Sequence, residues 1–124
     1  MNKYRLLIIY FFFILFSCTN SDNDDITNTC SVSNPIEDLD WLKLKIEELK
    51  QTNSTIIEYF YVSQNLYNDK TVFVFPNCCP QCSTIIPVYD CEGNTLGFVG
   101  DGNIDTNILN NDIIIWKPEN FACD

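Results

Sequence analysis

Cysteine is the residue type in this chain with the most chemistry open to it. The 124 residues include seven cysteines and no histidine. Cys18 is assigned to a lipid anchor below, and six cysteines then remain: Cys30, Cys78, Cys79, Cys82, Cys91 and Cys123. An even number of cysteines in a small exported domain predicts a disulfide framework. Adjacent Cys78 and Cys79 project to different sides of an extended chain, so we expect them to take different partners. Cys91 is expected to pair with Cys78, Cys79 or Cys82.

Two other chemistries use the same cysteines. The motif Cys79-Pro80-Gln81-Cys82 has the spacing of thiol–disulfide oxidoreductases, which lower a cysteine pKa at a helix N-terminus. The residues that follow are strand-like and include Pro87, which favours a structural disulfide, although reactive thiols in the motif would restore the redox interpretation. A four-cysteine zinc site would use Cys78, Cys79, Cys82 and Cys91, but the second CxxC that such sites carry is missing.

An acidic loop offers oxygen ligands at alternate positions. Asp101, Asn103, Asp105 and Asn107 are followed by Asp112 at position 12, which partly matches a calcium-binding loop. Thr106 replaces the glycine that permits the sharp turn at position 6, and the terminal aspartate is shorter than the usual glutamate. We therefore expect an ordinary Asn/Asp-rich turn here, and no metal or other cofactor.

The charge balance limits the classes of partner. The chain has 17 acidic and 7 basic residues, a net charge of −10. Nucleic-acid binding requires Lys and Arg to neutralise phosphates, so that class is excluded. The lack of histidine excludes Ser-His-Asp and Cys-His nucleophiles and histidine-bound metals. We expect a non-catalytic module, and the acidic charge favours a basic protein or peptide as its partner.

The N-terminus has the pattern of an export signal. Basic residues precede the apolar run Leu6–Phe16, which is too short to span a bilayer. Leu15-Phe16-Ser17-Cys18 then matches a lipobox, in which the cysteine thiol receives a diacylglyceryl group and becomes the new N-terminus. This predicts a signal peptide over residues 1–17 and a lipidated acidic tether over 18–33. The expected location is the outer membrane, lipid-anchored and at the cell surface, an oxidising environment.

Hydrophobic periodicity predicts the elements of one domain over residues 34–124. An amphipathic helix is expected over 34–50, capped by Asn34 and started by Pro35. Strands are expected over 55–62, 70–75, 83–89, 95–99 and 113–116, with Pro87 at an edge or a bulge. The loop 100–111 is expected to contain one helical turn near Ile108. A helix followed by hairpin-sized strands predicts an α+β fold, with the N-terminal amphipathic helix packed on a small antiparallel sheet and disulfides stapling the two.

Several short segments together resemble a family of small Bacteroidota lipoproteins of unknown function. They are the lipobox, the opening from Cys30 through residues 34–42, the strand 57–61, the Cys78-Cys79-Pro80 step, the turn 88–94 and the closing Ile115-Trp116-Lys117. The resemblance spans most of residues 30–117. It implies the same envelope location and fold class, and it implies no activity. A purely structural envelope component is the alternative to a binding module, followed by a thiol–disulfide oxidoreductase or a calcium-binding domain.

Overall fold

The computed structural model describes residues 30–124. The predicted signal peptide, Cys18 and the tether as far as residue 29 lie outside the described residues. The remaining part of the chain is a mixed α+β structure cross-linked by disulfides, which confirms the predicted class at that level.

The predicted helix is two helices, α2 (Pro35–Asp38) and α3 (Asp40–Thr52). Leu39 separates them with an extended backbone, and its side chain packs against the hydrophobic core. The expected side-chain cap from Asn34 does not form; instead, the Asn34 amide donates to the Asp38 carboxylate at 2.9 Å. The apolar spacing predicted one continuous helix, but the helix is interrupted at Leu39, whose side chain packs against the core.

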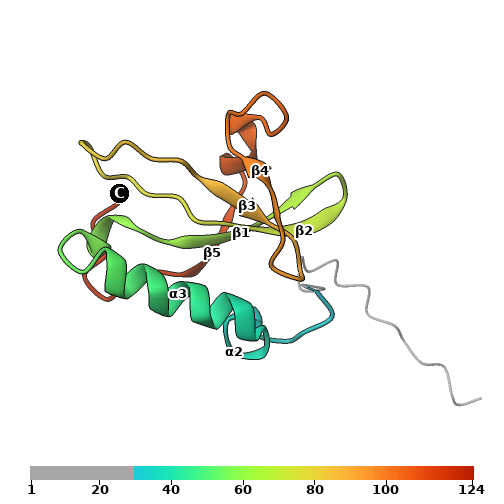
Figure 1. Cartoon of the computed structure of the whole chain (residues 1–124), viewed down its shortest axis with the longest axis horizontal. Helices are drawn as coiled ribbons and strands as arrows, with labels where there is room; N and C mark the ends of the chain where they lie inside the picture. The colour runs from blue at the N-terminus through green and yellow to red at the C-terminus, as the bar shows by residue number, and fades with distance from the viewer. Residues whose placement is uncertain (1–29) are drawn as a thin grey trace, which may run out of the picture.

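Five antiparallel strands form one sheet in the order β4-β3-β2-β1-β5 (Figure 1). Their bounds are β1 Val62–Tyr67, β2 Lys70–Val74, β3 Pro87–Tyr89, β4 Thr95–Phe98 and β5 Ile113–Trp116. Pro87 is the first residue of an interior strand, where its missing amide hydrogen is tolerated, and a bulge lies beside it between Val88 and Tyr89. Of the predicted alternatives for Pro87, an edge or a bulge, the edge is wrong and a bulge lies close by.

The first predicted strand is displaced along the chain. Residues 55–62 contain the short 3-10 helix η1 (Ile57–Tyr59), and β1 begins only at Val62. The β1–β2 hairpin turns at Asn68 and Asp69, both with positive φ, which is the backbone that two-residue hairpin turns require. Residues 65–67 belong to β1 and pair with the first residues of β2. The segment 55–62 contacts the C-terminal segment of the chain, because the Glu58 carbonyl accepts a hydrogen bond from the Ala122 amide at 2.8 Å.

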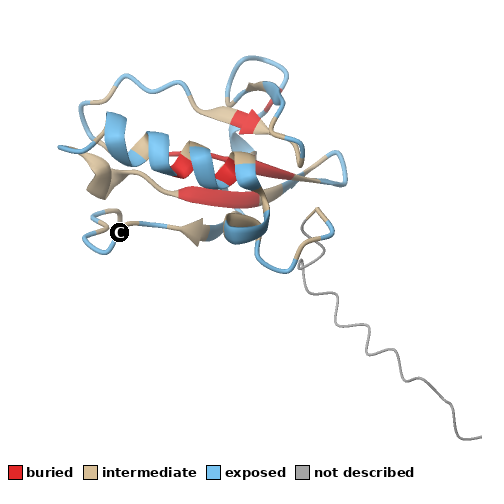
Figure 2. Cartoon of the chain, turned by 60° about the horizontal axis from the view of Figure 1, so that its bottom comes forward, coloured by how far each residue is buried: buried red, intermediate tan, exposed pale blue. Residues whose placement is uncertain are grey.

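The sheet is covered on both faces (Figure 1). Helix α3 places Leu42 and Ile46 against Val62, Phe73 and Phe75, which form the first core cluster. The opposite face is covered by the segment 100–111, which contains η2 (Thr106–Leu109) near the predicted helical turn. Ile104 packs there on Val72, Val74 and Val88. Buried residues accordingly lie in the middle layer and on the inner side of α3 (Figure 2).

Candidate functional site

All six cysteines of the described chain are paired, and adjacent Cys78 and Cys79 take different partners as predicted. The bridges are Cys30–Cys91, Cys78–Cys123 and Cys79–Cys82. The prediction that Cys91 pairs within the 78–82 group is wrong. The Trp41 indole nitrogen donates to the Cys91 carbonyl at 2.9 Å, so the helical segment lies beside the β3–β4 turn and brings Cys30 to Cys91.

The acidic loop uses its carboxylates to hold its own backbone. Asp101 accepts from the amides of Phe98 at 2.9 Å, Asn103 at 2.8 Å and Ile104 at 3.0 Å. These three hydrogen bonds hold the pKa of Asp101 below its usual value. Asp105 accepts from the Asn107 amide at 2.8 Å. Between residues 30 and 124 no group of three or more His, Cys, Asp or Glu side chains could hold a metal ion, so the predicted zinc and calcium alternatives gain no geometric support.

A hollow of about 630 Å³ lies where two turns of the sheet meet beside the Cys30–Cys91 bridge. The β1–β2 turn and the β3–β4 turn form its walls, at the right-hand end of the sheet in Figure 1. Three carboxylates line it: Asp69, Asp90 and Glu92. Lys70 is the basic residue of the lining, so the side chains of the hollow carry a net negative charge. We call this feature the acidic hollow.

Asp90 organises one wall of the acidic hollow. Its carboxylate accepts from the amides of Glu92 at 2.9 Å and Asn94 at 2.8 Å, and from the Asn94 side chain at 3.0 Å. Partial desolvation alone would raise the pKa of Asp90, but these hydrogen bonds outweigh it and lower the pKa. Asp90 therefore stays ionised at neutral pH while its oxygens remain occupied by the turn.

Trp41 forms the support beneath the same turn. A Cβ placed on Gly93 would lie 2.7 Å from Trp41 Cδ2, so the backbone of the turn rests directly on the indole ring. Gly93 also has φ of +84°, a left-handed conformation that favours glycine. The ring contacts Phe73 and Tyr89 with centroid distances of 5.6 and 5.7 Å, which links the wall of the acidic hollow to the core.

Sequence reasoning did not predict the acidic hollow. Asp69 lies 21 residues before Asp90, and the two turns that carry the carboxylates meet only because β2 and β3 are neighbours in the sheet. The available signal was the pair of turn sequences, 68–70 and 90–94, each of which combines Asn or Gly with acidic residues. Such a pair predicts two turns, but not that they share one end of the sheet.

The chain was compared with protein-family models, with curated proteins and with solved structures, and none of the three gives a match. Over residues 30–124, no helix is both long enough and apolar enough to cross a membrane.

Proposed function

We propose that this chain is a cell-envelope lipoprotein, similar to the small lipoproteins of Bacteroidota, whose folded body is a non-catalytic binding module. In this proposal residues 1–17 are a signal peptide and Cys18 carries the lipid that attaches the protein to the outer membrane. The acidic segment before residue 34 is a tether that presents the body at the cell surface. The ligand is a basic protein or peptide.

The pairing of all six described cysteines is the observation that carries this proposal. Disulfides persist in oxidising compartments and are rare where glutathione and thioredoxin keep thiols reduced. The pairs connect the start of the body, the end of the chain and the turns of the sheet. An extracytoplasmic location explains why so small a domain is cross-linked three times.

The acidic hollow supports the binding part of the proposal. Its volume of about 630 Å³ accommodates basic side chains, and its rim carries Asp69 and Glu92. Both are exposed, and neither carboxylate accepts a hydrogen bond within the described residues. Asp90, by contrast, is occupied by its own turn. Lys and Arg side chains of a partner would therefore contact mainly Asp69 and Glu92, in exposed ion pairs that salt weakens.

Binding can be tested by isothermal titration calorimetry with a poly-lysine peptide as the probe. The double variant Asp69→Asn/Glu92→Gln should weaken binding by on the order of tenfold at low salt. Glu119→Gln/Asp124→Asn is the matched control, because it removes the same charge elsewhere on the body. Equal losses in both variants would mean unspecific attraction, and no binding at all would favour the structural envelope role.

The lipid anchor can be tested in cells by labelling with radioactive palmitate. Cys18→Ala should abolish the label, because this cysteine is the acceptor in the lipobox. Ser17→Ala keeps a small residue before the cysteine and should retain the label, which makes it the control. Persistent labelling of Cys18→Ala would overturn the lipoprotein proposal, whatever the result of the peptide titration.

A further inference from the structure

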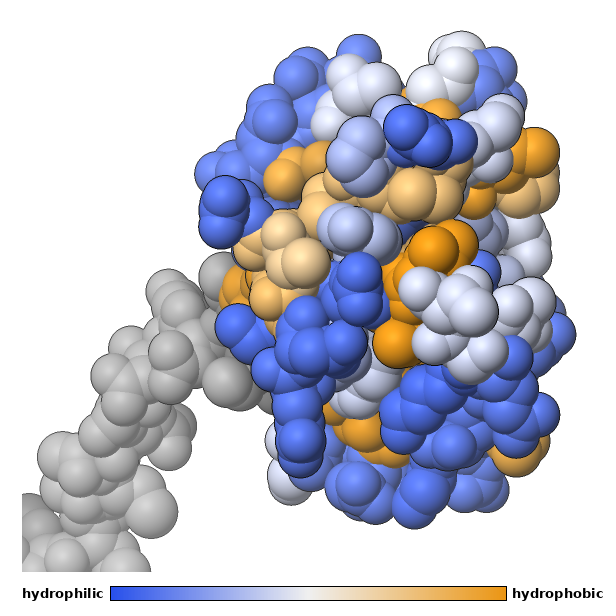
Figure 3. Space-filling model, turned by 90° about the vertical axis from the view of Figure 1, so that its left-hand side faces the viewer, coloured by the Kyte–Doolittle hydropathy of each residue, from blue (hydrophilic) through white to orange (hydrophobic). Residues whose placement is uncertain are grey.

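The loop between β2 and β3 carries the third disulfide outside the sheet. Cys79 and Cys82 are half-buried, and Pro80 and Gln81 between them are exposed. The loop lies at the end of the molecule that faces the viewer in Figure 3, opposite the acidic hollow in Figure 1. A reagent in solution can therefore approach this bridge from the exposed side of the loop.

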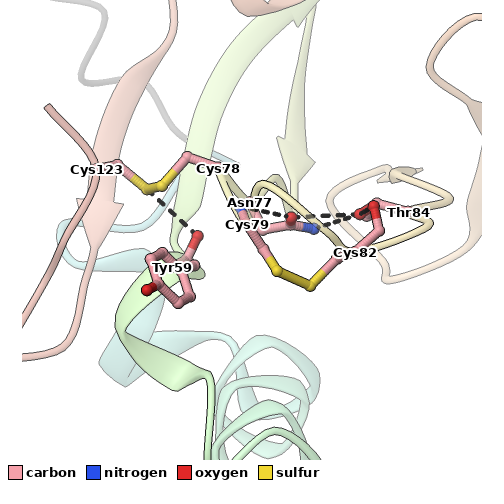
Figure 4. Close-up of a disulfide and its surroundings, with 7 residues drawn as sticks. All are labelled: Tyr59, Asn77, Cys78, Cys79, Cys82, Thr84 and Cys123. Carbon is pink, nitrogen blue, oxygen red and sulfur yellow. Dashed lines mark hydrogen bonds between the residues drawn. A yellow bond between two sulfur atoms is a disulfide. The ribbon is translucent and has the colours of Figure 1, made fainter.

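Side-chain hydrogen bonds hold this loop independently of its disulfide (Figure 4). The Asn77 side-chain oxygen accepts from the Cys79 amide at 3.2 Å, and its nitrogen donates to the Thr84 hydroxyl at 2.9 Å. That hydroxyl lies 3.3 Å from the Cys82 carbonyl, within donating distance. Asn77 and Thr84 thus join both ends of the loop, so two free thiols at Cys79 and Cys82 would remain close together.

The other two bridges are coupled to the packing of the fold. Cys30 packs against the core cluster beneath α3, and its bridge spans a sequence separation of 61. The Cys78–Cys123 bridge spans a sequence separation of 45 and holds a C-terminal segment whose Phe121 ring contacts the Tyr61 ring edge to face, with centroids 5.7 Å apart. Opening either of these bridges would release a packed segment of the chain. The Cys79–Cys82 bridge holds only a short loop, because its cysteines have a sequence separation of 3. A disulfide that stabilises the folded state is protected by the fold from reduction to the same extent. The short Cys79–Cys82 bridge stabilises the fold least, so the fold protects it least from reduction.

We propose that Cys79–Cys82 is an exchangeable disulfide, a site of reversible reduction by dithiols that leaves the fold and the other two bridges intact. A thiolate of the dithiol attacks one of the two sulfurs, so that a mixed disulfide forms and the Cys79–Cys82 bond breaks. The displaced cysteine leaves as a thiolate and takes up a proton. The second thiol of the reagent loses its proton and attacks the reagent's other sulfur atom, the one in the mixed disulfide. This releases the second cysteine as a thiolate, which is protonated in turn. The reagent ends as a disulfide, having lost two electrons and two protons, and the loop ends as a dithiol.

The local structure of this site differs from that of an oxidoreductase. Residues 83–86 form no helix, so Cys82 is not followed by the element whose N-terminus stabilises the thiolate in oxidoreductases. The CxxC motif of the sequence therefore keeps its exchange chemistry without the acid–base and helix-dipole features of a catalyst.

The test is a titration of the purified full chain with dithiothreitol, trapped with N-ethylmaleimide and mapped by mass spectrometry. Cys79 and Cys82 should be labelled at a dithiothreitol concentration at least tenfold below that needed to label the other four, with an unchanged circular dichroism spectrum. Labelling of Cys30, Cys91, Cys78 or Cys123 at the same or a lower concentration would overturn the proposal, as would unfolding that accompanies opening of the loop.

Two further arms sharpen the result. Reduced thioredoxin, a protein dithiol, replaces dithiothreitol in one arm; reduction by both identifies protein dithiols as competent reagents, and reduction by dithiothreitol alone restricts the site to small dithiols.

In the other arm, Asn77→Ala should slow reoxidation of the loop at least threefold, because the thiols are no longer held together. Gln81→Ala, which removes no side-chain hydrogen bond within the described residues, should reoxidise at the wild-type rate. Equal rates in both variants would contradict the role of Asn77.

Discussion

Two aspartates, Asp90 and Asp101, hold the turns on either side of β4 by accepting hydrogen bonds from backbone amides. Each accepts hydrogen bonds from backbone amides two to four positions away along the chain. A charged acceptor makes a stronger hydrogen bond than a neutral one, so these turns depend on ionised carboxylates. Asp101, the first of the residues that resembled calcium ligands, thus holds the backbone of its own turn.

Asp101→Ala should lower the melting temperature at pH 7, because three amides lose their acceptor. The folded pKa of Asp101 lies below the unfolded one, so its contribution is present above the unfolded pKa and disappears as the pH falls through the folded pKa. Melting curves of wild type and variant should therefore converge in acid. Asp124→Ala, which removes an exposed carboxylate without such bonds, should show no comparable difference at neutral pH, and parallel curves for Asp101→Ala at all pH values would contradict this account.

Gly93→Ala should destabilise the fold more than Gly102→Ala. Both positions have positive φ, +84° and +96°, so each substitution incurs the backbone penalty of about 1–2 kcal/mol. Only the Cβ at position 93 meets another group, the Trp41 ring at 2.7 Å, whereas nothing lies within 4 Å at position 102. Urea unfolding should place Gly93→Ala at least about 1 kcal/mol below its control. Equal losses would show that the turn moves away from the ring at no cost.

At the scale of elements, helix α3 is positioned by a narrow apolar stripe. Leu42 and Ile46 are buried, with 0% and 3% of their surface exposed, while Leu44 on the other side is 69% exposed. The stripe packs on the sheet from one side only, and ion pairs such as Lys50–Glu47 at 2.6 Å are exposed to solvent. Such exposed pairs contribute little, so burial of the stripe is the main attachment of the helix.

Leu42→Ala should therefore cost about 2–5 kcal/mol of unfolding free energy. Leu44→Ala makes the same chemical change in the same helix and should stay within about 0.5 kcal/mol of wild type. Chemical denaturation of the two variants side by side measures the difference directly. A loss of similar size in both would mean that α3 does not pack on the sheet through the face described.

Local patterns predicted the elements whose signals are local. The amphipathic stripe indicated α3, the β-branched runs indicated β2 and β5, and the loop with a turn near Ile108 contains η2. The first strand was misplaced because its position depends on pairing with β2 and on a hairpin turn at Asn68 and Asp69. Periodicity could not distinguish the 3-10 turn at Ile57–Tyr59 from a strand, because its aromatic and β-branched composition suits either.

At the scale of the whole molecule, the three bridges differ in what they hold together. Cys30–Cys91 joins the start of the body to the β3–β4 turn, and Cys78–Cys123 joins the loop after β2 to the C-terminal segment. The even cysteine count predicted a framework, but the partners are set by strand order and by the docking of α3. For the same reason, the acidic hollow, built from two separate hairpin turns, could not be predicted from the sequence.

Removal of Cys30–Cys91 should destabilise the body far more than removal of Cys79–Cys82. Closure of a loop with a sequence separation of 61 corresponds to about 4 kcal/mol, and of one with a separation of 3 to about 2 kcal/mol or less. Cys30→Ser/Cys91→Ser and Cys79→Ser/Cys82→Ser each lose two sulfurs, so each is the control for the other in urea unfolding. The reverse order of stabilities would contradict the coupling of the long bridge to the core.

The central claim is that the body is held by one defined set of three disulfides, and non-reducing peptide mapping tests it most directly. The protein is purified without reductant, alkylated under denaturing conditions, digested and analysed by mass spectrometry. The account predicts linked peptides for Cys30–Cys91, Cys78–Cys123 and Cys79–Cys82, with no other pairing. Alkylated Cys91, Cys91 linked to a residue of the 78–82 group, or six alkylated cysteines with stoichiometric zinc would contradict it.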